Sequence, residues 1–247
     1  MNAKELKEYL DFKYEQYNTP LFIESDPIQL PHRFTQKEDV EIVAFLVSII
    51  AWGNRTMIIK SGERLLQIMN NEPYQFIINY NSKELDFVHR TFNHIDLDFF
   101  FRSLKYLYQN GGLESAFTPN NLHPGVKGRI INFRKAFLAT EHLDRSTKHI
   151  SNPEKNSAAK RLNMFLRWMV RNDNSGVDFG IWKTISPSEL YLPLDVHTGN
   201  VSRELGLLTR KQNDWKALDE LMQRLREFDP IDPVKYDFAL FGIGAFE

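Results

Sequence analysis

The chain has 247 residues, with 31 Lys and Arg, 32 Asp and Glu, and a formal net charge of −1. Hydrophobic residues make up 42% and charged residues 26%, which excludes disordered and fibrous classes. No apolar run approaches the roughly 20 residues of a membrane span, and the charged N-terminal segment does not have the pattern of a secretory signal. No membrane association is therefore expected, and cytoplasmic residence is the default expectation. Cysteine is absent, which excludes disulfides, thiolate zinc sites and cysteine nucleophiles.

Hydrophobic periodicity predicts helices from one end of the chain to the other. Thr35 and Glu38 match a capping box, and the apolar run that follows, up to Gly53, predicts a buried central helix. Ser157 is the expected N-cap of the amphipathic helix 157–171. Further helices are predicted at residues 3–17, 56–69, 74–80, 96–109, 127–139, 196–205 (capped by Asp195), 214–226 and 233–241. Because no segment has a convincing strand pattern, the predicted fold class is all-α.

The domain organisation follows from the absence of linkers. We find no internal repeat, no low-complexity tract and no interdomain linker, so residues 1–247 are interpreted as one all-helical domain. The alternative is a pair of interleaved lobes, one of about residues 30–140 and one of residues 1–29 plus 141–247.

Positive charge is concentrated in the middle of the chain. From Arg102 to Arg171 there are 13 Lys and Arg against 4 Asp and Glu, a local sum of +9, while the other residues hold 18 basic and 28 acidic residues, a sum of −10. A basic segment suits a surface that binds a polyanion, because Lys and Arg displace counterions from phosphates. The alternative is a set of charges scattered over a solvated surface.

Several kinds of chemistry lack their motifs. Asp195 and His197 have no further ligands at metal-binding spacing, so no metal ion is predicted. The glycine-rich loops that bind nucleotides and the G-x-S-x-G turn of serine hydrolases are absent, and no cofactor is predicted.

Lys160 and Asp195 are the remaining candidates for chemistry. Lys160 follows Ala158 and Ala159, so it can lie on a tightly packed helical turn, where desolvation favours the neutral amine that attacks electrophilic carbon. Asp195 precedes a helix, where its carboxylate could stabilise a developing cation or orient a proton transfer. The alternatives are a solvated lysine and an ordinary N-cap.

These two residues lie in segments with a family resemblance. The segment SAAKRLNMFLRWMVR, followed by LPLDVHTGNVSREL, resembles the core of the helix-hairpin-helix DNA glycosylases. The resemblance implies two helical lobes with a cleft between them, Lys160 as the Schiff-base nucleophile and Asp195 as its acidic partner. Their separation of 35 positions is similar to that in the archaeal 8-oxoguanine glycosylase branch. The absence of cysteine excludes the branches that carry an iron-sulfur cluster.

The same resemblance implies residues that bind DNA. The segment VAFLVSIIAWGNRTMII resembles the early buried helix and the loop after it, so Asn54 or Arg55 would fill the gap left by a flipped base. The usual L-P-G-[VI]-G hairpin is replaced here by residues 149–156, and the expected DNA contacts around it are Lys148, His149, Asn156, Ser157 and Arg161.

The last predicted helix contributes a candidate base pocket. Asp237 and Phe241 share a helix face, and in the archaeal branch an acid and an aromatic residue at similar places read and stack on the base. The alternative is that Phe241 belongs to the core and Asp237 pairs with a basic neighbour.

Over most of its length the chain also resembles the uncharacterised bacterial family DUF2400, in segments that include PLDVHTGNVSRELGLL and FDPIDPVKYDFALFGIG. The expected function is a DNA base-excision glycosylase with a lyase step, acting on a duplex that holds a damaged base, such as an oxidised purine. Two alternatives remain: a nucleic-acid-binding helical protein without catalysis, and a helical domain that binds an acidic protein. The sequence predicts no oligomeric state.

Overall fold

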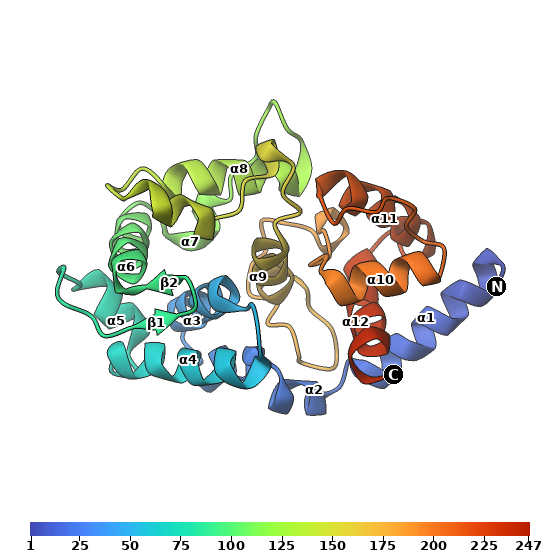
Figure 1. Ribbon diagram of the computed structural model, residues 1–247, viewed down its shortest axis with the longest axis horizontal. Helices are drawn as coiled ribbons and strands as arrows, with labels where there is room; N and C mark the ends of the chain where they lie inside the picture. The colour runs from blue at the N-terminus through green and yellow to red at the C-terminus, as the bar shows by residue number, and fades with distance from the viewer. The chain divides into compact units, whose positions relative to one another are not determined.

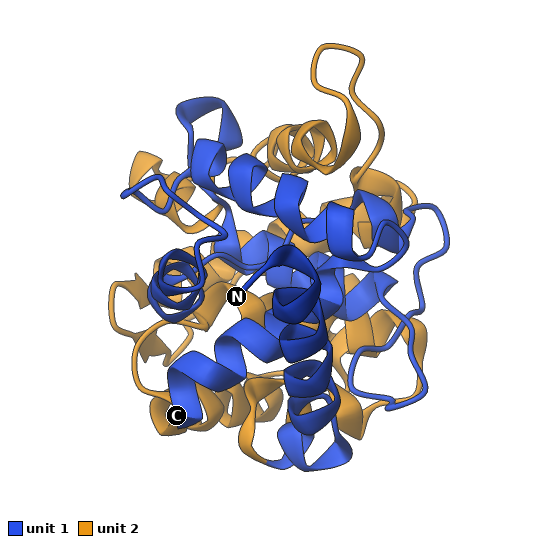
Figure 2. Cartoon of the chain, turned by 90° about the vertical axis from the view of Figure 1, so that its right-hand side faces the viewer, with its two compact units in different colours: residues 1–24, 153–247 blue, residues 25–152 orange.

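The computed structural model describes all 247 residues, and the chain is helical along most of its length (Figure 1), which confirms the prediction of a mainly helical protein. Two compact units divide the chain: residues 1–24 and 153–247 form unit 1, and residues 25–152 form unit 2 (Figure 2). The alternative organisation from the sequence places these divisions near residues 29 and 140. A membrane crossing would need a longer and more apolar helix than any in this structure.

Unit 2 is organised around a buried helix, α3 (Lys37–Ile50). Every residue of α3 from 40 to 50 is buried, as the continuous apolar run predicts. Phe45 of this helix packs against the rings of Phe100, Phe133 and Phe137 at centroid distances of 5.4–6.0 Å. Aromatic pairs at such distances add to the stability gained by burying apolar surface.

The ends of the unit 2 elements differ in part from the prediction. The expected Thr35–Glu38 capping box does not form, because Gln36 occupies the N-cap position of α3 without a side-chain hydrogen bond. The structure also has a β-hairpin whose two strands, Val88–His89 and Phe92–Asn93, have two residues each. Segments this short give no strand pattern in the sequence, so the hairpin was not predicted. The remaining helices and strands of unit 2 are η1 (Pro27–Gln29), η2 (Pro31–Arg33), α4 (Arg55–Ile68), α5 (Pro73–Ile78), β1 (Val88–His89), β2 (Phe92–Asn93), α6 (His94–Gln109), α7 (Gly112–Ala116), α8 (Gly125–Phe137) and η3 (Asp144–His149).

Unit 1 joins the two ends of the chain. Its helices are α1 (Ala3–Tyr17), most of α2 (Pro20–Ser25), η4 (Pro153–Lys155), α9 (Lys160–Val170), η5 (Pro187–Glu189), α10 (Val196–Glu204), α11 (Trp215–Phe228), η6 (Pro233–Lys235) and α12 (Tyr236–Phe246). α12 packs against both α1 and α10 (Figure 1), so the first and last helices of the chain support each other. The short helices α2 and α7 were not predicted.

The crossing of α1 and α12 depends on a glycine. A Cβ atom at Gly242 would lie 2.1 Å from the ring carbon Cδ2 of Tyr17, so only a residue without a side chain lets the two helices approach this closely. Gly244, two residues further along α12, is less crowded, because a Cβ atom there would lie 3.1 Å from Val201.

We expect Gly242→Ala to lower the free energy of unfolding by up to about 2 kcal/mol, because overpacking usually costs about 1–3 kcal/mol and alanine regains roughly 1 kcal/mol in a helix. Urea denaturation followed by circular dichroism measures this change. Gly244→Ala is the matched control in the same helix, with an expected change close to zero. Equal effects of the two substitutions would contradict this account of the crossing.

Candidate active site

Lys160 is the first residue of α9. The helix begins three residues later than predicted: Ser157 is not its N-cap, and Ala159 holds that position with φ 47°, in the left-handed region, and without a side-chain hydrogen bond to the helix. The Ser157 hydroxyl instead accepts a hydrogen bond from the Ala159 backbone N–H at 3.2 Å. A left-handed alanine is unfavourable by about 1–2 kcal/mol, so the surrounding structure must hold this turn in place.

Asp195 is the N-cap of α10, as predicted. Its Oδ1 atom accepts a hydrogen bond from the Thr198 backbone N–H at 2.9 Å. That bond fixes the rotamer of the side chain and leaves the second carboxylate oxygen, Oδ2, directed at another group.

That group is the amine of Lys160. The Nζ atom of Lys160 lies 3.2 Å from Asp195 Oδ2, and the two side chains are 36% and 16% exposed. The two residues that the sequence singled out, 35 positions apart, therefore meet within unit 1. The desolvation expected for the amine is partial, because the Lys160 side chain is neither buried nor fully open to solvent. The pair is accessible to a ligand, and its carboxylate is placed to accept a proton from the amine.

Asp237 belongs to a buried ion pair. It is 4% exposed, and its carboxylate accepts a hydrogen bond from Arg167 Nη1; the Arg167 Nε atom also lies 3.2 Å from Asp178 Oδ1. Its carboxylate thus takes the alternative role, a pair with a basic neighbour. Burial raises the pKa of Asp237 to about 7, and the negative charges of Asp195 and Asp178 act in the same direction, against the opposing effect of Arg167.

This pKa predicts a pH dependence of stability. Because the folded chain binds the proton of Asp237 more tightly than the unfolded chain, stability should fall as the pH rises from about 4 to about 7. The contribution is at most about 4 kcal/mol, for three pH units at about 1.4 kcal/mol each. Asp237→Asn should remove it, which denaturation curves across this pH range measure. Asp86→Asn, at an exposed carboxylate, is the control; an unchanged slope in Asp237→Asn would contradict the assignment.

Phe241 lies one turn after Asp237 and is partly exposed. Its ring packs edge-on against Phe22 at 6.2 Å and against Phe246 at 6.2 Å. It therefore belongs to an aromatic cluster of unit 1, with part of the ring left open to solvent.

The expected DNA contacts fall in both units. In unit 1, Asn156 has φ 63° and donates from Nδ2 to Asp214 Oδ2 at 2.8 Å. Arg161 is partly exposed, and burial lowers its pKa to about 10. In unit 2, Lys148 and Asn54 are exposed, Arg55 is half-buried, and Asn54 caps α4 by accepting a hydrogen bond from the Met57 N–H.

His149 is a core residue of unit 2, so the expectation that it contacts DNA is wrong. It is 2% exposed, its ring stacks on Trp52 at 5.8 Å, and its Nε2 atom lies 3.3 Å from Asp96 Oδ2. A polar residue inside a loop sequence gives no local sign of such burial. Its contact with Asp96, more than 50 positions earlier, cannot be recognised from neighbouring residues.

The segment from Arg102 to Arg171 contributes less positive charge to the protein surface than its count of Lys and Arg suggests. Arg167 and Arg171 are buried and paired with carboxylates that lie outside the segment, and Arg145 pairs with the buried Asp96. Part of the excess positive charge is therefore neutralised inside each unit.

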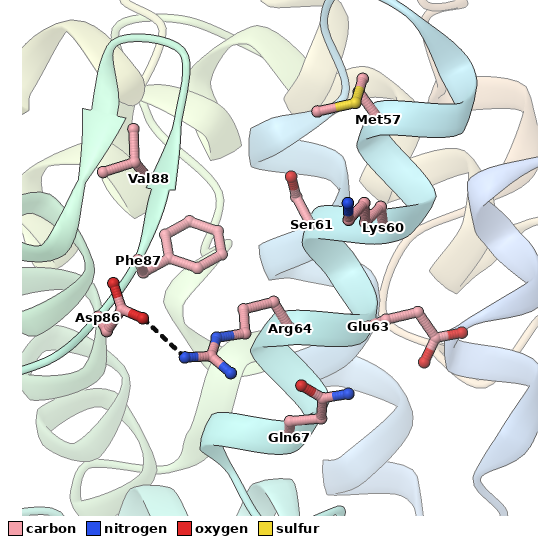
Figure 3. A pocket seen from close by; sticks show the side chains of 9 residues that line it. All are labelled: Met57, Lys60, Ser61, Glu63, Arg64, Gln67, Asp86, Phe87 and Val88. Carbon is pink, nitrogen blue, oxygen red and sulfur yellow. Dashed lines mark hydrogen bonds and ion pairs between the residues drawn. The ribbon is translucent and has the colours of Figure 1, made fainter.

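Unit 2 has a separate cavity of about 540 Å³ along α4 (Figure 3). Phe87 and Val88 form one side, and Ser61, Lys60 and Arg64 of α4 form the other. The Ser61 hydroxyl lies 2.8 Å from Nδ1 of the buried His89, and this hydrogen bond ties the hairpin to the helix. No sequence motif indicated this cavity, because its two walls are more than 20 positions apart.

Comparison with known proteins identifies a family. Neither the curated proteins nor the solved structures include a match to the chain. One family model, described as "Protein of unknown function (DUF2400)", matches residues 26–246, which include Lys160, Asp195, nearly all of unit 2 and the C-terminal part of unit 1. The chain therefore belongs to the DUF2400 family.

Proposed function

We propose that this protein is a DNA base-excision glycosylase with a lyase step, acting on duplex DNA that holds a damaged base such as an oxidised purine. The observation that carries the proposal is the pairing of Lys160 Nζ with Asp195 Oδ2 at 3.2 Å, both partly exposed. An amine beside a carboxylate is the arrangement that imine-forming catalysis at a sugar carbon requires. The resemblance of the two surrounding segments to helix-hairpin-helix glycosylases supports the same chemistry.

The first step exchanges one bond for another at the sugar carbon C1′. Lys160 passes a proton to Asp195, and the neutral amine attacks C1′ as the bond from C1′ to the base breaks. The base leaves with that electron pair and takes up the proton that Asp195 received, which restores the carboxylate. Positive charge develops on the sugar as the bond breaks, and the Asp195 carboxylate stabilises it.

The second step cleaves the strand. The amine adduct loses a proton, and its nitrogen lone pair forms the C=N bond as the C1′–O4′ bond breaks. O4′ leaves with the bonding pair and takes up a proton, which gives an imine between Lys160 and C1′. The imine makes the C2′ proton acidic; its loss expels the 3′-phosphate by β-elimination. A damaged base favours the whole sequence because flipping it out of the stack costs less than flipping a paired base.

Borohydride trapping of the wild-type protein tests the proposal. Hydride reduces the imine carbon and leaves a stable covalent adduct between protein and DNA. We expect adducts with duplexes that hold an oxidised purine or an abasic site, and none with an undamaged duplex of the same sequence. If no damaged base and no abasic site gives an adduct, the lyase proposal is wrong. Salt-dependent duplex binding without any product would favour a binding protein without catalysis, and no binding at low salt would favour a protein-interaction domain.

A further inference from the structure

Two adjacent residues before α11 contact both segments of the candidate site. Asn213 donates from its side-chain Nδ2 to the backbone carbonyl of Asp195 at 2.7 Å. Asp214 accepts on Oδ2 from Asn156 Nδ2 at 2.8 Å, and the next backbone N–H, that of Trp215, donates to the carbonyl of Asn156 at 3.0 Å. Asn213 thus binds the start of α10, and Asp214 and Trp215 bind the turn that leads into Lys160.

The orientation of the Asn213 amide is fixed by a neighbour. Arg203 Nη2 donates to Asn213 Oδ1 at 2.6 Å, so the amide oxygen faces the guanidinium and the amide nitrogen must face Asp195. Gly199 provides the space for this contact, because a Cβ atom there would lie 2.6 Å from Asn213 Oδ1. The arrangement is therefore built by three residues of α10 and its following loop rather than by one chance hydrogen bond.

Asp214 is held equally firmly. Its Oδ1 atom caps α11 by accepting from the Ala217 N–H at 3.0 Å and also accepts from Arg210 Nε at 2.7 Å. The hydrogen bonds from Arg210 hold the pKa of Asp214 well below its usual value, so the carboxylate keeps its charge when it binds Asn156. Asn156 and Ala159 both have left-handed backbone conformations, and such conformations persist only where neighbouring contacts determine them.

We infer that Asn213 and Asp214 are positioning residues that hold Lys160 and Asp195 at their 3.2 Å separation. They act through the backbone of Asp195 and through Asn156, and they do not touch the reacting atoms. The consequence for catalysis rests on the proposed function; the consequence for the geometry of the pair does not. A shift of about 1 Å at a reacting group is enough to lower a rate by about 100-fold.

The test uses Asn213→Ala and Asn156→Gly in the full chain; glycine tolerates the left-handed conformation of position 156. Asn213→Ala removes the contacts with the Asp195 carbonyl and with Arg203, Asn156→Gly removes the contact with Asp214, and both leave the α11 cap and the Arg210 pair in place. The first readout is acetylation of the Lys160 amine by an activated ester, followed by mass spectrometry from pH 6 to 10. Release of the amine from Asp195 should raise its labelling rate at least about threefold in both variants. The second readout is borohydride trapping, which should slow by about 10–100-fold.

Thr209→Val is the matched control. It lies in the same loop, and its hydroxyl bonds to Glu220 rather than to either site segment. We expect no change in labelling or trapping, with a thermal stability close to that of the two test variants. Unchanged Lys160 labelling in both Asn213→Ala and Asn156→Gly, or an equal change in Thr209→Val, overturns the inference. If the wild-type protein never traps while labelling still rises in the two variants, the glycosylase proposal fails and the positioning role stands.

Discussion

Replacing Lys160 with glutamine should abolish borohydride trapping on damaged DNA while duplex binding survives. Glutamine has no basic amine and so cannot form an imine, whatever the remaining geometry. Its amide can still donate to Asp195, and position 160 is the partly exposed first residue of α9, so the fold should be unaffected. Loss of one cation should reduce the salt dependence of binding by no more than about one phosphate contact. Denaturing gels of the reduced adduct measure the first effect, and fluorescence anisotropy measures the second.

Asp195→Asn is the companion variant. The asparagine oxygen can still accept from the Thr198 N–H, and asparagine is as good an N-cap as aspartate, so stability should stay the same. Trapping should slow by about 100- to 10,000-fold, because the group that accepts the amine proton and stabilises the developing cation is lost. Undiminished trapping by Lys160→Gln would mean that another amine forms the imine, and the assignment of Lys160 would be wrong.

The helices were predictable because their signals are local. The buried run of α3 and the periodic segments of α6 and α11 can be recognised from neighbouring residues alone. The Asp195 cap is also local, since it involves a backbone N–H only three positions away. The start of α9 was misplaced because a serine before a periodic segment usually caps it, whereas here Ala159 adopts a left-handed conformation that tertiary contacts impose.

Of the candidate active site, only the two principal residues, Lys160 and Asp195, could be predicted from the sequence. Their distance depends on Asn213, which binds Asp195 from 18 positions away, and no periodicity connects them. Charge was misjudged for a related reason. A count of charges along the chain treats Arg167 as a surface cation. In the structure Arg167 is buried and pairs with Asp178 and with Asp237, which lies 70 positions away in the sequence.

Arg171 is the centre of the largest ion-pair network of unit 1. It is fully buried, with Nη1 2.5 Å from Asp173 Oδ2 and 3.1 Å from Asp178 Oδ2, and with Nε 2.8 Å from Asp232 Oδ2. It also donates from Nη2 to the hydroxyl of Tyr14 on α1 at 2.8 Å. One guanidinium thus holds α1, the loop after α9 and the segment before α12 together.

We expect Arg171→Met to lower the free energy of unfolding at pH 7 by about 3–5 kcal/mol, because Asp173 and Asp232 would lose their cation and Asp178 would keep only Arg167. Urea denaturation measures this loss. Arg224→Met is the control, since Arg224 and its partner Glu227 are both more than half exposed and such pairs contribute less than about 1 kcal/mol.

The loss should shrink as the pH falls towards 4. In the wild-type protein Arg171 lowers the pKa of Asp173 below its usual 3.8, against the opposing effect of burial, so this contribution to stability is still present at pH 4 and is lost only at lower pH. In the variant the uncompensated carboxylates bind protons more tightly when folded than when unfolded, so acidification stabilises the variant relative to the wild type. A loss of the same size at pH 4 and pH 7 would show that Arg171 acts through the packing of its side chain, with little contribution from its charge.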